Sequence, residues 1–361
     1  MTAPLGKTAA APAAVRISGA RTVRAGRFSV RFRPRAVAAG LLALAAAAAF
    51  AVLCIGSGQY AMGFGRVLDA LTGHGSPADT FIVRELRLPR ACVALAVGAA
   101  LGLAGAVFQA VVRNPLGSPD LLGFTSGSAT GALVAIVYLG GSAGAVATGA
   151  AAGGIATGVL VYALAWRRGV HGFRLVLTGI GLTAALTGVN GYLLTRAQLT
   201  DAARAVLWQT GSLDGRGWDN VAPLAVAMAV VVPALLLGCG PALRMLEMGD
   251  DTASALGVRV ERVRLALIGG AVVLTALAAA AAGPVAFVAL TAPQLARRAT
   301  RAPGPNLLPA MAVGAALLTA SDWIAQRAFD DHPLPVGVVT GLLGGVYLVA
   351  MLAAERRAGR I

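Results

Sequence analysis

Several stretches of about twenty residues in this chain contain no charged side chain, and a helix of that length crosses a lipid bilayer. Soluble domains carry about 25% charged residues, whereas only 12% of these 361 residues are charged and 57% are hydrophobic. The sequence therefore predicts an all-α polytopic membrane protein with about ten transmembrane helices. The eighth candidate has about a dozen residues, so it could be a half-helix or a re-entrant segment. The ten candidates are 36–55, 91–111, 121–139, 143–166, 175–195, 221–239, 265–283, 284–295, 307–325 and 334–354.

The distribution of basic residues predicts the orientation of the spans. With ten spans both termini lie on one side, and the segments on that side hold 22 of the 30 Lys and Arg residues. The positive-inside rule then places both termini in the cytoplasm. A formal net charge of +15 would indicate nucleic acid for a soluble chain, but membrane orientation accounts for the charge without a nucleic-acid partner.

The first 35 residues contain eight bases and no acid, with Pro, Gly, Ala and Ser between them. This composition is typical of a disordered basic tail. A cleaved signal peptide is the competing interpretation of the run 36–55, but the run is too long and no convincing cleavage site follows it. We expect a cytoplasmic tail over 1–35, a single transmembrane domain over 36–355 and a short C-terminal tail over 356–361.

One polar segment, Met245–Arg264, lies between two long hydrophobic runs. Asp250 or Asp251 can cap a short helix at Thr252–Leu256, and Gly257 suits the position that ends it. A helix this short is not stable alone in water, because nucleation costs more than one or two turns return. We expect it to pack against a partner protein, at the point where energy enters the molecule.

Motifs for catalysis are not found in the sequence. The chain has no Gly-x-x-x-x-Gly-Lys-Ser/Thr phosphate loop, and its three histidines and three cysteines show no metal-like spacing. Gly140–Gly144 formally matches a nucleophile elbow, but it lies between two hydrophobic helices with no histidine near it, so a flexible turn is the better interpretation. No catalytic residue, metal site or bound cofactor is predicted for this chain.

Three further features interrupt the apolar pattern. The segment Arg113–Gly123 holds two prolines and two glycines, which force a non-helical connection. It is either a plain loop or a gate on a translocation path, since irregular backbone at membrane depth must be buried or line a cavity. The charged cluster Arg84–Arg90 is either an interface anchor or a docking patch for an acidic partner. Asp322 is the one acid well inside a candidate span, and intramembrane carboxylates mark function by default.

Glycines recur at every fourth position in two spans. One set is Gly123, Gly127 and Gly131, and the other is Gly337, Gly341 and Gly345. Each set lines one helix face and permits the close approach of another backbone. Close helix packing is the first interpretation of both sets, and a subunit interface is the second.

Five segments, in this order along the chain, resemble the FecCD family. They are RLPR (87–90), GAALGLAGAVFQAVVRNPLGSPDLLGFTSG (98–127), LEMGDDTASALGV (246–258), GPVAFVALTAPQLARR (283–298) and LPVGVVTGLLGG (334–345). The family comprises the permease subunits of type II ATP-binding-cassette (ABC) importers for iron–siderophore complexes and vitamin B12. The resemblance extends from about Arg35 to the C-terminus. Segments 164–175, 245–262 and 322–329 look most like one of the two permease subunits of ferric-enterobactin importers.

The resemblance implies a ten-helix subunit that works with several partners. These are a second permease, favoured to be a different chain rather than a copy, two cytoplasmic ATPases that bind ATP and Mg, and an extracytoplasmic siderophore-binding protein. The implied site residues are a cytoplasmic gate (Asn114, Pro115, Leu116, Gly117, Pro119), an ATPase-coupling segment (Glu247, Met248, Gly249, Asp250, Asp251, Ala253, Leu256, Gly257) and docking arginines (Arg87, Arg90, Arg327).

The chain departs from the family pattern at three places. Gln294 follows Pro293 where the family usually has histidine, and Gln326 stands where a docking arginine would fall, with Arg327 beside it. Residues 171–173 differ from the small hydroxyl residues of the vitamin B12 branch. Gln294 remains, with Asp322, a candidate intramembrane polar residue. We expect an importer of ferric siderophore in the cell membrane; import of cobalamin or haem, an ion-gradient-driven transporter and a membrane scaffold are the alternatives.

Overall fold

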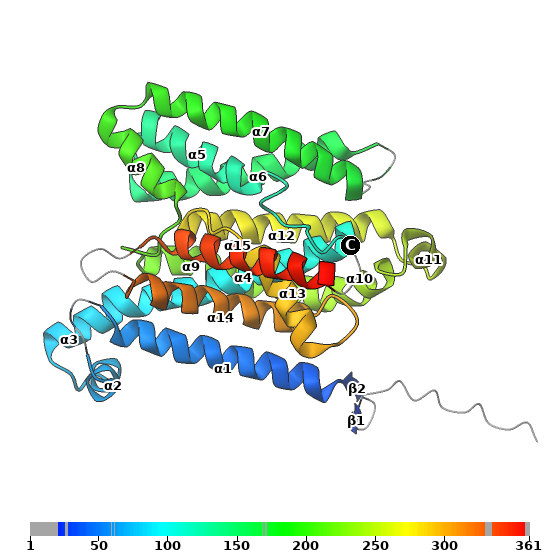
Figure 1. Cartoon of the computed structure of the whole chain (residues 1–361), viewed down its shortest axis with the longest axis horizontal. Helices are drawn as coiled ribbons and strands as arrows, with labels where there is room; N and C mark the ends of the chain where they lie inside the picture. The colour runs from blue at the N-terminus through cyan, green and yellow to red at the C-terminus, as the bar shows by residue number, and fades with distance from the viewer. Residues whose placement is uncertain are drawn as a thin grey trace, which may run out of the picture.

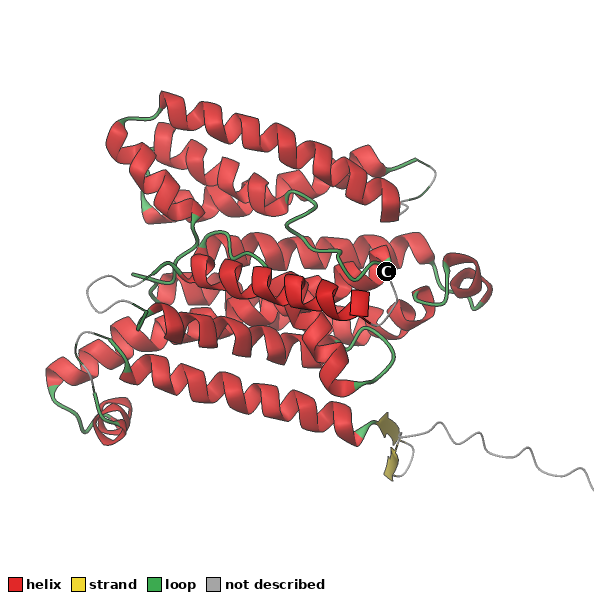
Figure 2. Cartoon of the chain, in the orientation of Figure 1, coloured by secondary structure: helices red, strands yellow, loops and turns green. Residues whose placement is uncertain are grey.

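The computed structural model describes residues 21–25, 28–58, 60, 62–167, 169, 172–328 and 334–357, and nearly all of them are helical (Figure 1, Figure 2). Among these described residues, eight helices or continuous helical runs are long and apolar enough to cross a membrane. They are α1 (Pro34–Gly56), α3–η1–α4 (Pro77–Phe81, Ile82–Arg87, Leu88–Val112), α6 (Ala143–Ala165), α7 (Gly172–Arg196), α9–η2–α10 (Trp218–Pro233, Ala234–Cys239, Gly240–Leu246), α12 (Val260–Ala282), α14 (Leu307–Ala325) and α15 (Val336–Arg357).

Shorter helices complete the architecture. Two of them, α5 (Phe124–Tyr138) and α13 (Val288–Thr300), occupy the remaining two of the ten stretches where a span was predicted. The predicted all-α membrane fold is therefore confirmed, with eight segments of full spanning length and two shorter ones. The connections hold the short helices α2 (Phe64–Thr72), α8 (Leu199–Gln209) and α11 (Asp250–Ala255).

Two of the long runs contain a π-helical segment, and each segment lies just before a proline. η1 is followed by Pro89 and η2 by Pro241. A proline has no N–H group and its ring crowds the carbonyl four residues earlier, so the helix widens locally without breaking. The run Pro77–Val112 is therefore continuous, and the charged cluster Arg84–Arg90 is part of a helix rather than a loop before the span at 91–111.

The centre of the molecule is formed by α4 and α12. In the most apolar 18 residues of each run, 78% are buried in Pro77–Val112 and 67% are buried in α12. In α7 only 11% are buried. α14 and α1 pack together on one side of α4, while α5, α6 and α7 form the layer that packs on α12 (Figure 1). At Gly105 of α4 a Cβ would collide with the carbonyl oxygen of Ala289 in α13, so only glycine permits this approach.

Large apolar side chains cover much of the outer surface. Leu42 of α1, Leu177 of α7, Val226 of α9 and Val349 of α15 are all more than half exposed. Apolar exteriors of this extent are unfavourable in water, and they mark surfaces that lipid or partner helices cover. The exposed faces and the buried α4–α12 centre together fit a polytopic membrane protein.

The eighth span begins later and ends later than predicted. α12 ends at Gly283 (φ +73°), and residues 284–287 form a non-helical break that closes with Phe287 in the left-handed region (φ +66°). α13 then continues to Thr300, past the predicted end at 295. The prediction ended the span at 295 and left Arg297 and Arg298 in the connection that follows, yet cations in the last turn of a helix are favoured by its dipole.

The expected disorder of residues 1–35 is wrong for part of that segment. β1 (Arg21–Ala25) and β2 (Phe28–Phe32) pair in antiparallel register, with Val23 opposite Val30 and Ala25 opposite Phe28. β-branched and aromatic residues favour a pleated strand, whereas the prediction weighed the charge and the Pro, Gly, Ala and Ser content of residues 1–35. Residues 1–20, and residues 358–361 of the expected C-terminal tail, lie outside the described residues.

The two glycine sets lie in different surroundings. A Cβ at Gly127 or Gly131 would collide with α6, so this set packs inside the chain. In the second set Gly337 lies against the carbonyl of Thr210, whereas Gly341 and Gly345 have nothing near them among the described residues. The exposed part of α15 therefore stays a predicted subunit interface.

Candidate functional site

The functional candidates gather at the two opposite ends of the helical bundle. The α3 end holds α2, α3, α8 and residues 210–217, and the α11 end holds residues 113–123, α10 and α11 (Figure 1). α1 begins and α15 ends at the α11 end, as an even number of crossings requires (Figure 1).

The short helix α11 forms where it was expected, with a different cap. It spans Asp250–Ala255, and Gly249 (φ +112°) occupies the N-cap position that the sequence assigned to an aspartate. Both aspartates lie in the first turn instead, where negative charge is favoured by the helix dipole. Gly257 adopts φ +83° just beyond the C-cap, as predicted.

Asp250 connects α11 to two long helices through ion pairs. Its Oδ1 accepts from Nη2 of Arg113, at the end of α4, at 3.0 Å, and its Oδ2 accepts from Nη2 of Arg264 in α12 at 2.8 Å. The Arg264 side chain is only 5% exposed and also bonds to Glu261 at 3.0 Å. A displacement of α11 therefore acts directly on the residue that begins the segment 113–123.

Large exposed apolar side chains flank α11 on both sides. Ala253 is fully buried, whereas Met248 and Leu256 are 60% and 57% exposed. Large apolar groups at the tip of a polar segment indicate a protein contact surface. Beside them, Glu247 is half-buried and 4.0 Å from Arg297, and burial raises the pKa of its carboxyl.

The segment 113–123 is a series of turns whose first part is exposed. Arg113 ends α4 in the left-handed region (φ +55°). The side-chain oxygen of Asn114 accepts the N–H of Leu116 at 2.9 Å, and its carbonyl accepts the N–H of Gly117 at 3.0 Å. Asn114, Pro115 and Leu116 are exposed, whereas Gly117 and Pro119 are buried.

Gln294 of α13 forms a hydrogen bond to the backbone of this segment. Its Nε2 donates to the carbonyl of Pro115 at 2.9 Å, and its Oε1 lies 3.5 Å from the hydroxyl of Tyr347 in α15. Gln109 of α4 makes a similar bond to the carbonyl of Leu290 at 3.0 Å, and its Oε1 has no partner among the described residues. The predicted gate residues and Gln294 are therefore one connected unit.

At the α3 end, Asp322 is a structural partner of Arg90. Nη2 of Arg90 donates to Oδ1 of Asp322 at 2.9 Å and Nε to Oδ2 at 3.2 Å, while the Asp322 side chain is completely buried. Gln326 donates to the same carboxylate at 2.8 Å. The departure from arginine at position 326 thus leaves Asp322 with a single charged partner inside the bundle.

The other two predicted docking arginines donate to neutral acceptors. Arg87 bonds to the carbonyls of Ile55 and Tyr60 at 2.8 and 2.6 Å. Arg327 bonds to the hydroxyl of Ser57 at 3.3 Å, and its guanidinium lies 5.2 Å from the ring centroid of Trp323. Both therefore keep a net positive charge at the α3 end.

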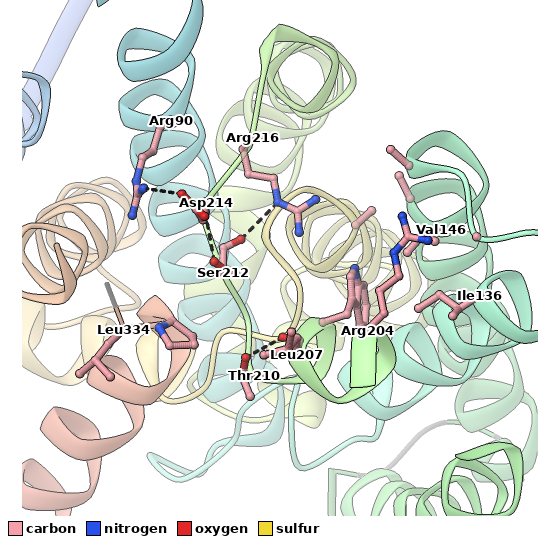
Figure 3. A pocket seen from close by; sticks show the side chains of 16 residues that line it. Arg90, Ile136, Val146, Arg204, Leu207, Thr210, Ser212, Asp214, Arg216 and Leu334 are labelled. Carbon is pink, nitrogen blue, oxygen red and sulfur yellow. Dashed lines mark hydrogen bonds and ion pairs between the residues drawn. The ribbon is translucent and has the colours of Figure 1, made fainter. Parts of the chain in front are cut away.

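A cavity of about 420 Å³ lies at the α3 end between α8, the α5–α6 layer and α4 (Figure 3). Arg90, Arg204 and Arg216 line it, together with Asp214 as its one acid and the indole of Trp208. Asp214 pairs with Arg90 at 3.2 Å, and Nε of Arg216 donates to the carbonyl of Ser212 at 3.2 Å. Burial lowers the pKa of the Arg216 guanidinium.

Sequence reasoning missed several of these residues. Arg113 and Arg264 were counted as cytoplasmic charges, and no local sequence signal identified their ion pairs with Asp250. Arg204 and Arg216 were counted as outer charges, although bases on that side run against the orientation rule. Among the described residues, no three His, Cys, Asp or Glu side chains are grouped as metal ligands.

Comparisons with known proteins agree with this architecture. The model of the FecCD transport family matches residues 44–354. The ferric enterobactin transport system permease protein FepG of Escherichia coli K12 is 46% identical over 319 residues, covering 88% of this chain and 96% of that protein. The permease protein FepD of the same system is 35% identical over 303 residues, covering 81% and 88%.

A solved structure also matches in fold. It is described as an inward-facing conformation of a metal-chelate type ABC transporter and superposes with a TM-score of 0.76 at 27% identity. The match covers 88% of this chain and 99% of that one. The whole helical bundle, with both candidate ends, therefore lies within the matched region.

Proposed function

Because the chain belongs to the FecCD transport family, we propose that it is the membrane-spanning permease subunit of an ABC importer that carries a ferric siderophore across the cytoplasmic membrane. The observation that carries this proposal is the 46% identity to FepG along 88% of the chain. The family is one of transport subunits, and this chain performs no chemistry on its cargo.

The complete transporter needs further chains. FepG and FepD belong to one system and both resemble this chain, with FepG the more similar, which supports a second permease of the FepD kind rather than a copy. The exposed apolar face of α15, around Gly341 and Gly345, is available for that contact. Two ATPases supply ATP hydrolysis with Mg, and an extracytoplasmic binding protein delivers the siderophore.

The α11 end is the cytoplasmic end in this proposal. The positive-inside rule favours it, because the segments predicted to lie on the side of both termini hold 22 of the 30 Lys and Arg residues. A cytoplasmic α11 can meet the ATPase with Met248 and Leu256, which are exposed and without partners in the described chain. Asp251 is exposed beside them.

Asp250 transmits the movement rather than touching the ATPase. Both of its carboxylate oxygens are engaged by Arg113 and Arg264, so the force that the ATPase applies to α11 reaches the end of α4 directly. The gate residues Asn114, Pro115 and Leu116 follow Arg113 without interruption. The bond from Gln294 to Pro115 at 2.9 Å restrains this segment until α11 moves.

At the opposite end, Arg87 and Arg327 are the better candidates for docking the binding protein. They donate to neutral acceptors, so their charge is available to acidic residues of a partner. Arg90 is neutralised by Asp322, so its role at this end is structural. The same pair weakens the alternative of ion-gradient coupling, because such a transporter needs a mid-span carboxylate that can bind and release its ion.

Reconstitution tests the proposed function. The chain is co-expressed with its second permease and ATPase, placed in liposomes with the binding protein, and supplied with radiolabelled ferric siderophore. Uptake should require ATP and should survive collapse of the proton gradient. Uptake that survives ATP depletion but stops with the proton gradient would favour the secondary transporter, and intact uptake in Asn114→Arg would favour a scaffold. Cobalamin and haem serve as competing cargoes.

A further inference from the structure

Eight arginines lie at the α3 end of the bundle, and the fold accounts for six of them. Arg90 and Arg66 pair with carboxylates, Arg84 and Arg87 donate to backbone carbonyls, and Arg196 and Arg327 lie over aromatic rings. Arg204 and Arg216 have neither a carboxylate pair nor an aromatic partner among the described residues. Both line the cavity beside α8.

The two arginines reach the cavity from different elements (Figure 3). Arg204 comes from α8 and lies against the turn at Gly141, where a Cβ would stand 3.1 Å from its Nη1. Arg216 comes from the loop 210–217, and its Nε is fixed by the carbonyl of Ser212. Its terminal nitrogens have no acceptor among the described residues, although the side chain is withdrawn from water enough to lower its pKa.

The charge of the cavity is not balanced within the chain. Three guanidinium groups line it against the single carboxylate of Asp214, and Arg90 already has Asp322 behind it. Arg216 is partly withdrawn from water, and the only carboxylate among the described residues of the cavity wall, the exposed Asp214, already pairs with Arg90. An entering anion therefore adds favourable charge pairing for Arg204 and Arg216. Guanidinium forks match oxygen anions in two-point contacts, and the indole of Trp208 offers an aromatic face in the same wall.

We propose that the cavity lined by Arg204, Arg216 and Trp208 binds a negatively charged oxygen-donor arm of the iron chelate, a catecholate or a carboxylate, before the chelate enters the pathway. This proposal rests on the proposed function and adds a cargo-binding subsite inside one permease. A volume of about 420 Å³ lies within the range of small-ligand sites and suits one arm of a chelate rather than the whole.

The test uses the complete transporter in nanodiscs of phosphatidylcholine, without the binding protein. The probe is iron(III) tris-catecholate, a trianion, and neutral iron(III) tris-acetohydroxamate is its uncharged counterpart. Binding of radiolabelled iron is measured by equilibrium dialysis for Arg204→Gln, Arg216→Gln and the double variant. Arg196→Gln is the matched control, because Arg196 is an exposed arginine at the same end that does not line the cavity.

We expect each cavity variant to weaken binding of the trianion about tenfold, the loss of one charge-assisted hydrogen bond. Arg196→Gln should bind like the wild type, and the neutral complex should bind weakly to every variant. Equal loss in Arg196→Gln, or unchanged binding in the double variant, would overturn the proposal. The proposal would also be overturned if added phosphatidylglycerol displaced the trianion from the wild type but not from the double variant, because a lipid phosphate would then be the ligand.

Uptake assays separate this proposal from the proposed function. With the binding protein present, the double variant should raise KM for the anionic chelate and leave kcat unchanged. Wild-type transporter that imports no chelate with ATP would contradict the proposed function itself. Wild-type uptake with an unchanged KM in the double variant would contradict only the cavity site. Loss of ATPase stimulation by the binding protein, with unchanged probe binding, would make the cavity a docking site and overturn the proposal.

Discussion

The two ends of this bundle each contain a carboxylate held by arginine, and the two clusters are built for different purposes. At the α3 end Asp322 is completely buried and receives Arg90 and Gln326. At the α11 end Asp250 is 30% exposed and bridges Arg264, which is buried, and Arg113, which is 46% exposed. Burial makes the first cluster a fixed brace, and partial exposure allows the second to exchange partners. The comparison predicts large stability effects at one end and large transport effects at the other.

Removing the carboxylate of the buried cluster should have the largest effect on stability. Asp322→Ala leaves Arg90 with only the exposed Asp214 as a counter-charge, and breaking a buried pair in this way costs about 3–5 kcal/mol. Thermal unfolding of the protein in detergent should show a large drop in midpoint. Asp214→Ala is the matched control, because it removes the exposed partner of the same arginine and should cost less than about 1 kcal/mol.

A double replacement sharpens the interpretation of that loss. Arg90→Met with Asp322→Leu removes both charges, and apolar replacements of a buried pair are often neutral or stabilising. The double variant should recover most of the stability that Asp322→Ala loses. If Asp322→Ala were as stable as Asp214→Ala, the buried brace would have no structural role.

Breaking the exposed cluster should affect transport far more than stability. Asp250→Asn cannot hold two guanidinium groups, so movement of α11 would no longer reach Arg113. ATP-driven uptake should fall about tenfold, while ATPase activity persists. The free energy of unfolding should fall less than in Asp322→Ala, because the buried Arg264 keeps Glu261 as a partner at 3.0 Å. Glu85→Gln, an exposed acid at the α3 end, is the control and should transport normally.

The partner variant tests whether the effect passes through α4. Arg113→Gln should reproduce the uncoupling of Asp250→Asn, and the double variant should be no worse than either single, because residues in one contact are not additive. Normal uptake in Arg113→Gln would refute the link between α11 and the gate.

A smaller effect is expected at the gate itself. Gln294→Leu leaves the carbonyl of Pro115 without its donor, at a cost of about 1 kcal/mol, so segment 113–123 should open more often without ATP. Efflux of chelate from preloaded liposomes should rise a few-fold. Gln294→His keeps an N–H donor at this position and should remain close to the wild type; equal leakage in both variants would show that the hydrogen bond does not hold the gate.

Much of the fold could be predicted because its signals are local. Apolar runs locate the helices, and Gly257 ends α11 through a positive φ that the sequence announces. The pairs Asp250–Arg113, Asp322–Arg90 and Gln294–Pro115 could not be predicted, because each joins positions more than a hundred residues apart. The aspartate cap of α11 failed for the same reason. Its carboxylate has a stronger use in binding Arg113 and Arg264 than in capping a short helix.

The smallest predicted effect concerns Glu247, a partly buried acid, and is compared with Glu85, an exposed one. Glu247 at the α11 end is desolvated and only weakly paired with Arg297 at 4.0 Å, so its folded-state pKa lies above the ordinary value of about 4.3. A raised pKa favours the folded state while the group is protonated, and that stability is lost as pH rises through the folded pKa. Glu247→Gln should therefore raise the unfolding midpoint slightly at pH 7 and leave it unchanged near pH 4. Glu85→Gln, an exposed acid at the α3 end, controls for the lost charge, and an equal shift in both variants would show that net charge, rather than burial of Glu247, is the cause.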